Sequence, residues 1–91
     1  MRILVVNPVG TDIWDKKDEE YLRRFARKDT SINVLSLNDG PNSLETFQSM
    51  AYVCPSIIEL AKKCEGKYDA MMVNCFGDPC VKALREIVDI P

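Results

Sequence analysis

The chain has 91 residues, which allows one small domain with a single hydrophobic core. Its formal net charge is −2, whereas nucleic acids and anionic membranes bind concentrated positive charge, so we expect neither as a partner. No apolar run approaches the length of a membrane span or of a secretory leader, and the four cysteines lack zinc-type spacing. We therefore expect a cytoplasmic protein with reduced thiols and no metal.

Strand, helix and strand are predicted in the first part of the chain. Residues 3–6 are rich in β-branched side chains, which predicts a buried strand. After a turn, an amphipathic pattern predicts a helix over residues 13–28, and residues 32–37 alternate as a second strand. The helix is expected to bury three aromatic side chains: Trp14, Tyr21 and Phe25. Its basic residues are expected to face solvent: Arg23, Arg24, Arg27 and Lys28.

The middle of the chain carries two predicted helical segments and a third strand. Ser43 is expected to cap a short helical stretch that runs through Met50. Pro55 is expected to interrupt this stretch and to open a new helix over residues 55–64, because proline is poorly tolerated inside a helix. The apolar run 70–73 predicts a strand that is buried on both faces, as parallel strands are.

The residues after this third strand are the first candidate for chemistry. Cys75 follows the strand, and an apolar pattern over residues 81–88 predicts a helix close behind it. Asp78 is predicted to be the N-cap and Pro79 the first helical residue. Unpaired amides and the helix dipole favour an anion there, so the Cys75 thiol is a candidate base or nucleophile. The alternative is that Cys75 is a small buried apolar residue.

The element order β-α-β-α-β-α with short connections predicts a parallel sheet with right-handed crossovers. We expect an α/β three-layer sandwich with strand order 2-1-3, helices on both faces, and a fourth strand absent from this chain. Ligands bind beyond the strand carboxyl ends where the order switches, which places loops 7–11 and 74–80 around one crevice. The bare edge of the third strand predicts that this chain is the first part of a longer protein, or that it forms a homo-oligomer.

Several motifs together resemble those of one enzyme family. Residues 3–8 read Ile-Leu-Val-Val-Asn-Pro, and residues 40–45 read Gly-Pro-Asn-Ser-Leu-Glu. Pro55 opens a predicted helix, and Tyr-Asp-Ala at 68–70 leads to Cys-Phe-Gly-Asp-Pro at 75–79. These motifs resemble the aspartate/glutamate/hydantoin racemase superfamily, closest to hydantoin racemase. The resemblance covers essentially the whole chain, as a single lobe that forms the N-terminal part of a two-lobe racemase.

The resemblance implies cofactor-independent inversion of a carbon next to a carbonyl group, in an amino acid or a 5-substituted hydantoin. In this chemistry two cysteines face opposite sides of the carbon, one removing a proton and the other delivering one. Cys75 matches the cysteine of the first lobe. The backbone N–H groups of Phe76 and Gly77 would stabilise the developing oxyanion, and Asn7 and Thr11 would orient this small-molecule substrate. Neither a cofactor nor a metal is implied.

The chain departs from the family pattern in ways that leave the substrate open. Val9 and Gly10 stand where the family's first loop has polar side chains, and Cys80 stands where a glycine is usual. No second lobe with its own cysteine is present, and Cys80 would lie on the same side of the substrate as Cys75. The alternative function is therefore a non-catalytic small-molecule-binding lobe. The absence of histidine leaves only cysteine, carboxylate or lysine as a base near neutral pH.

Overall fold

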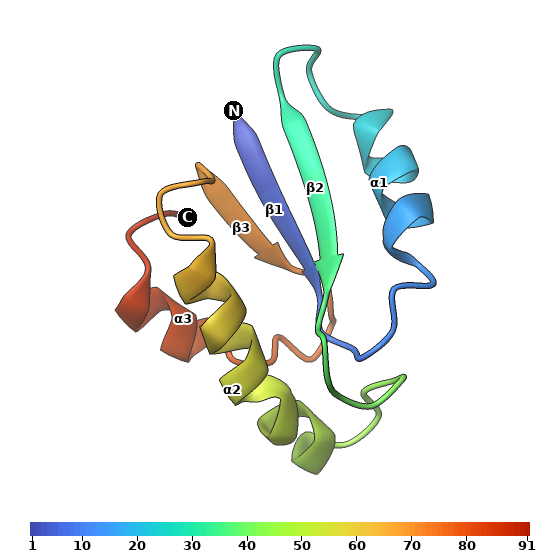
Figure 1. Ribbon diagram of the computed structural model, residues 1–91, viewed down its shortest axis with the longest axis vertical. Helices are drawn as coiled ribbons and strands as arrows, with labels where there is room; N and C mark the ends of the chain where they lie inside the picture. The colour runs from blue at the N-terminus through green and yellow to red at the C-terminus, as the bar shows by residue number, and fades with distance from the viewer.

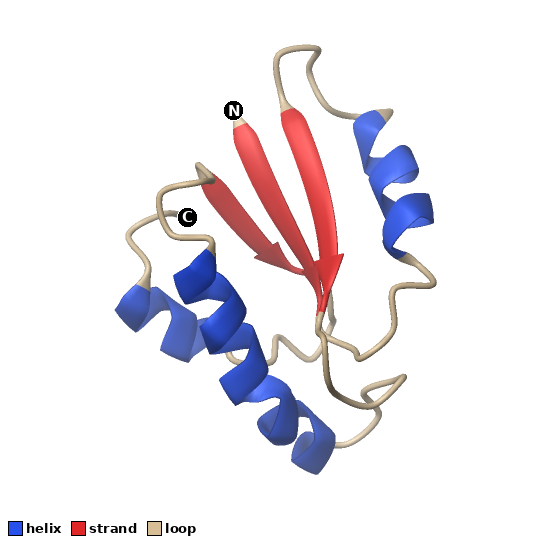
Figure 2. Cartoon of the chain, in the orientation of Figure 1, coloured by secondary structure: helices blue, strands red, loops and turns tan.

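The computed structural model describes residues 1–91 as an α/β fold built on a three-stranded parallel sheet (Figures 1 and 2). The elements are β1 (Arg2–Asn7), α1 (Asp15–Arg23), β2 (Ser31–Ser36), α2 (Phe47–Lys63), β3 (Ala70–Val73) and α3 (Val81–Ile87). The spatial order is β2-β1-β3, so the predicted fold class and strand order are confirmed. No helix is both long and apolar enough to cross a membrane.

The central strand β1 contributes to the packing on both faces of the sheet. Its side chains alternate, so Leu4 and Val6 face one side and Val5 faces the other. The larger core lies between the sheet and helices α2 and α3: Leu4, Val6, Leu37, Val53, Ile57, Ala61 and Leu84. The smaller core lies on the α1 side: Val5, Ile32 and Val34. Helices thus cover both faces, with α1 alone on one of them (Figure 1).

Helix α2 is continuous through Pro55, so the prediction of two separate helical segments is wrong. Thr46 rather than Ser43 is the N-cap, and its hydroxyl oxygen accepts a hydrogen bond from the backbone N of Ser49 at 3.1 Å. Fully buried side chains lie at one-turn spacing on both sides of the proline: Val53, Ile57 and Ala61. Burial of this continuous stripe outweighs the proline's cost of roughly 3 kcal/mol.

Helix α1 is shorter than predicted and does not bury its aromatic residues. Trp14, Tyr21 and Phe25 are 44%, 57% and 75% exposed. The side of α1 that faces the sheet carries Asp15, Asp18 and Leu22 instead. These residues are three and four positions apart, so they share one face of the helix. Tyr21 and Phe25 remain exposed and contact each other, with ring centroids 5.3 Å apart and ring planes tilted by 59°.

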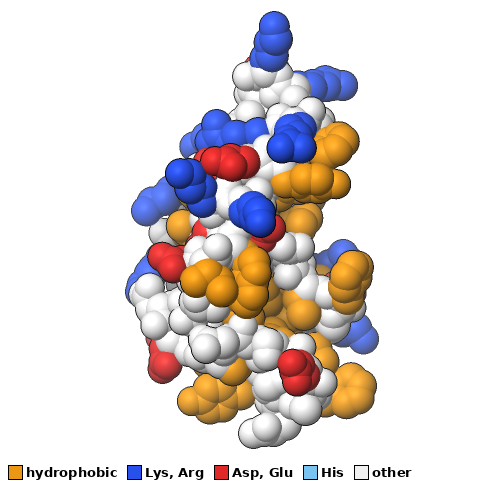
Figure 3. Space-filling view, turned by 90° about the vertical axis from the view of Figure 1, so that its right-hand side faces the viewer, with side chains coloured by type: hydrophobic (Ala, Val, Ile, Leu, Met, Phe, Trp, Pro, Cys, Tyr) orange, Lys and Arg blue, Asp and Glu red, His pale blue; other side chains and the backbone are white.

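The basic residues around the end of α1 are exposed, as predicted. Figure 3 views the molecule from the side of α1 and shows Lys and Arg side chains gathered over the upper part of this face. Arg23 belongs to the helix, where its guanidinium donates to Glu19 at 2.8 Å, while Arg27 and Lys28 lie beyond the helix end. These basic residues thus form a solvated surface, in which Arg23 is paired with Glu19.

Two of the four cysteines are joined, so the prediction of four reduced thiols is wrong. A disulfide links Cys54 of α2 to Cys80 at the start of α3, with their Cα atoms 5.2 Å apart. Cys64 and Cys75 are free. The pairing arises because α2 and α3 pack side by side on the same face, which brings together residues separated by 26 positions in the sequence.

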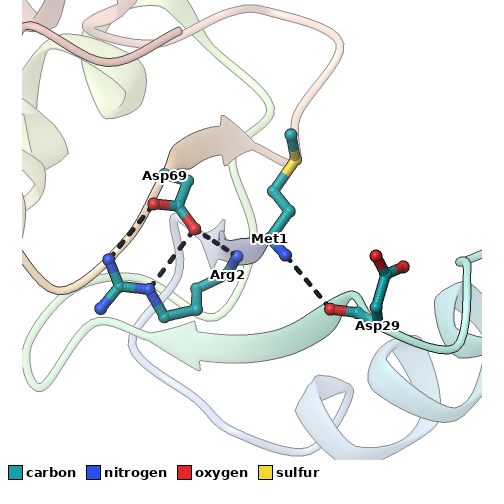
Figure 4. A network of polar contacts seen from close by, with 4 residues as sticks. All are labelled: Met1, Arg2, Asp29 and Asp69. Carbon is teal, nitrogen blue, oxygen red and sulfur yellow. Dashed lines mark hydrogen bonds and ion pairs between the residues drawn. The ribbon is translucent and has the colours of Figure 1, made fainter.

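An ion pair joins the start of β1 to the residue before β3 (Figure 4). The Asp69 carboxylate accepts hydrogen bonds from the Arg2 backbone N at 2.6 Å and from Arg2 Nη2 at 3.2 Å. The side-chain hydrogen bond, followed by the backbone one, holds the pKa of Asp69 below its ordinary value of 3.8. A lowered pKa in the folded state means that the pair stabilises the fold above pH 3.8 and loses this effect as pH falls further.

We expect the variant Asp69→Asn to be less stable than the wild type at neutral pH, by a small amount that salt reduces, since both side chains are half exposed. The difference in free energy of unfolding should shrink as pH falls below 3.8, because the wild-type carboxylate then becomes protonated. Urea denaturation at a series of pH values measures this difference. A difference that stays constant down to strongly acidic pH would contradict the assignment.

Candidate active site

The carboxyl ends of β1 and β3 open onto a groove at the predicted switch point. The register pairs Val6 with Val73, so the residues that follow, Asn7 and Asn74, lie side by side. The groove has a volume of about 280 Å³, near the low end for small-molecule sites. It is lined by Asn7, Pro8, Val9, Trp14, Asp18, Asn42, Ser43 and Asn74.

Asn7 is the buried polar centre of this groove, with only 5% of its surface exposed. Its Nδ2 donates to Asp15 Oδ1 at 2.9 Å and to Asp18 Oδ2 at 3.0 Å. Its Oδ1 accepts a hydrogen bond from Asn74 Nδ2 at 2.8 Å. Both amide hydrogens and the carbonyl oxygen of Asn7 therefore have partners, as a buried amide requires.

The two carboxylates lie in the first turn of α1, where the helix dipole stabilises negative charge. Asp15 is also tied to the sheet, because its Oδ2 accepts a hydrogen bond from the backbone N of Ser36 at 3.0 Å. The contacts link the N-terminus of α1 to the carboxyl ends of β1 and β2. This side of the groove consequently carries negative charge without a basic partner in the network.

Cys75 lies in the loop between β3 and α3, next to Asn74. Its side chain is half-buried, belongs to neither hydrophobic cluster and forms no disulfide. The reading of Cys75 as a mere core residue is therefore not supported. Cys75 is not among the residues that line the groove, but its chain neighbour Asn74 is.

The loop reaches α3 differently from the prediction. The helix begins at Val81 with Cys80 as N-cap, so the assignment of Asp78 as N-cap and Pro79 as first helical residue is wrong. Asp78 and Cys80 have left-handed φ values of 48° and 69°, which are uncommon for residues other than glycine. Because these turns intervene, Cys75 precedes the helix by a full loop instead of facing its first turn.

Two backbone amides in this loop are available to a ligand. The N–H groups of Phe76 and Gly77 donate no hydrogen bond within the chain, whereas Asp78 N donates to the Cys75 carbonyl at 3.1 Å. Phe76 is fully exposed. A Cβ on Gly77 would overlap Met50 Sδ of α2, so a larger residue here requires the Met50 side chain to shift.

Thr11 lies on the first loop, outside the lining of the groove. Its Oγ1 accepts a weak hydrogen bond from the backbone N of Ile13 at 3.5 Å, so its hydroxyl hydrogen has no partner within the chain. Thr11 does not cap α1, whose N-cap is Trp14. Of the predicted site residues, the structure thus places Asn7 in the lining of the groove and leaves Thr11, Cys75, Phe76 and Gly77 outside it. Gly77 instead lines a separate hollow over the start of α3.

Three polar residues were not predicted as site residues: Asp18 and Asn74, which line the groove, and Asp15, which accepts a hydrogen bond from Asn7. Asn74 is exposed, and its side chain lies beside that of Asn7. A signal existed, since an asparagine stands directly after each of the paired residues Val6 and Val73, at the carboxyl ends of two neighbouring parallel strands. No group of three or more His, Cys, Asp or Glu side chains is arranged to hold a metal ion.

Comparison with known proteins gives concordant results. A family model described as Asp/Glu/Hydantoin racemase matches residues 3–91. The chain is 38% identical over 92 residues to hydantoin racemase of Pseudomonas sp. (strain NS671), and 29% identical over 93 residues to hydantoin racemase of Paenarthrobacter aurescens. Both alignments cover 100% of this chain, and 37% and 39% of the respective relatives.

A solved structure is similar over the same extent. Allantoin racemase from Klebsiella pneumoniae superposes with a TM-score of 0.92 at 25% sequence identity, covering 100% of this chain and 38% of that one. The chain therefore spans less than half the length of each of these three relatives.

Proposed function

The chain belongs to the Asp/Glu/hydantoin racemase family, and we propose from this that it contributes one half of the active site of a cofactor-independent racemase. The observation that carries the proposal is the placement of Cys75. It is a free, half-buried cysteine at the carboxyl end of β3, next in the chain to the groove residue Asn74 on one side and to two unpartnered amides on the other. In an α/β sheet this is the place where ligands bind.

In the proposed reaction Cys75 acts on one face of the carbon that is inverted. As thiolate it removes the proton next to a carbonyl group, and as thiol it returns a proton to the same face in the reverse direction. Inversion requires a second acid–base group on the opposite face, since a single one would return the proton to the side from which it came. We propose that this second acid–base group is supplied by residues other than the 91 described here.

Removal of the proton places negative charge on the carbonyl oxygen, and this charge needs a fixed hydrogen-bond donor. The N–H groups of Phe76 and Gly77 are free and lie next to Cys75 in the chain, which supports their assignment as oxyanion donors. Thr11 retains a hydroxyl hydrogen with which to orient the substrate. Asn7 contributes to the same task as the buried centre of the groove.

Among the two substrate classes, we propose a 5-substituted hydantoin rather than an amino acid. The carboxylate of an amino acid needs a cationic partner, and the lining of the groove contains Asp18 but no Lys or Arg, whereas a neutral ring needs no such partner. The similar proteins are a pair of hydantoin racemases and an allantoin racemase. Charge and similarity thus favour the same class of substrate.

Hydrogen exchange tests this function directly. The complete protein, incubated with one enantiomer of a 5-substituted hydantoin in D₂O, should incorporate deuterium at C5 and lose optical activity, both faster than a protein-free control. Proton NMR and polarimetry follow the two processes. Binding without exchange above the control would reject the racemase and favour the non-catalytic binding lobe.

A further inference from the structure

The orientation of the Asn7 amide is dictated by its neighbours. A carboxylate can only accept hydrogen bonds, so the Nδ2 group of Asn7 must face Asp15 and Asp18. The Oδ1 atom is then forced to the opposite side, towards Asn74. With 5% of its surface exposed, Asn7 has no solvent to compensate a rotated amide.

The orientation of the Asn7 amide determines the orientation of the Asn74 amide. Because Asn7 presents an oxygen, Asn74 must present its Nδ2 group, which it does at 2.8 Å. Its own Oδ1 atom is thereby set as a hydrogen-bond acceptor with no partner within the chain. Asn74 is exposed, lines the groove and precedes Cys75, so this oxygen is available to a molecule that reaches the thiol.

We propose that Asn74 is a specificity-determining residue, whose Oδ1 atom accepts a hydrogen bond from a ring N–H of the substrate. Asp15, Asp18 and Asn7 are positioning residues, which hold the Asn74 amide in the orientation that this contact requires. The inference rests on the proposed function for its substrate class. A cyclic ureide has a ring N–H that can donate a hydrogen bond to the Asn74 Oδ1 atom. A substrate without this N–H would leave that acceptor without a partner in the complex.

The test compares a hydantoin with derivatives that lack one N–H. The probes are 5-benzylhydantoin and its two mono-N-methyl derivatives, and calorimetry measures their dissociation constants with the complete protein. In the wild type, methylation of one ring nitrogen should weaken binding by about tenfold or more. In Asn74→Ala, the parent compound should bind about tenfold more weakly, and the same methylation should then have little further effect.

The positioning residues are tested by the double variant Asp15→Asn/Asp18→Asn. Its amides can donate as well as accept, so Asn7 is free to rotate and Asn74 is no longer forced to present its oxygen. We expect a reduced methylation penalty, with the thermal midpoint little changed. If Asp15 and Asp18 had a purely structural role, their replacement would not alter the discrimination between the probes. Asn38→Ala is the matched control, because Asn38 is exposed and lies outside the groove.

The outcomes separate this inference from the proposed function. A methylation penalty of equal size in the wild type and in Asn74→Ala overturns the role of Asn74, even where C5 exchange is present. An undiminished penalty in the double variant overturns the role of Asp15 and Asp18. A penalty that Asn74→Ala abolishes supports the inference, even where exchange is absent and the racemase proposal fails. Absence of any binding of 5-benzylhydantoin to the wild type overturns both.

Discussion

Replacement of Cys75 by alanine is expected to lower the rate of C5 hydrogen exchange in a 5-substituted hydantoin by at least about a thousandfold. The thiol is the proposed proton-transfer group on its face of the substrate, and alanine can neither accept nor donate a proton. The free cysteine lies outside both core clusters, so the variant should remain folded. Deuterium incorporation in D₂O, followed by proton NMR, measures the effect.

The matched control is Cys64→Ala, because Cys64 is the other free cysteine and is also half-buried. Cys64 packs against the larger core and does not line the groove, so the exchange rate of this variant should stay within about twofold of the wild type. The dissociation constant for the hydantoin should change little in Cys75→Ala, because the groove is lined by other residues. Undiminished exchange in Cys75→Ala would exclude this thiol as the base.

The largest effect on stability is expected from Ile57→Ala in α2. Ile57 is 0% exposed and lies in the larger core between α2 and the sheet. Truncation removes buried methylene and methyl groups and leaves a cavity, which should lower the free energy of unfolding by roughly 2–5 kcal/mol. Urea denaturation measures this loss, with an unchanged slope showing that the native state is otherwise intact.

Ile87→Ala serves as the comparison, since this isoleucine lies at the end of α3 and is 37% exposed. It has less apolar surface to lose and little cavity to leave, so we expect a cost of about 1 kcal/mol or less. Equal losses in the two variants would show that α2 is not packed as described. Such a result would also remove the explanation given above for a helix that continues through Pro55.

Pro55 shows how a local rule led to a wrong boundary although the sequence held the correct signal. The one-turn spacing of Val53, Ile57 and Ala61 continues in phase across the proline and predicts one helix. A proline inside a helix costs a few kcal/mol, and the burial of three side chains contributes more free energy than this. In α1 the apolar pattern did not identify the buried side, because Asp15 and Asp18 occupy the sheet-facing positions that were predicted for the aromatic residues.

The strands, their order and the loop that carries Cys75 could all be predicted from the amino-acid pattern. Hydrophobic periodicity is a local property, and short connections between alternating strands and helices leave few topologies. These elements agree with the structure, apart from their ends.

Which polar groups meet depends instead on how the elements pack against one another. The contact of Asn7 with Asn74 depends on the register of β1 against β3, and the disulfide depends on how α2 docks beside α3. Such pairings join residues far apart in the chain, and their energies depend on distances of a few ångströms that no local pattern encodes. The acceptor that Asn74 turns towards the groove is therefore a product of packing.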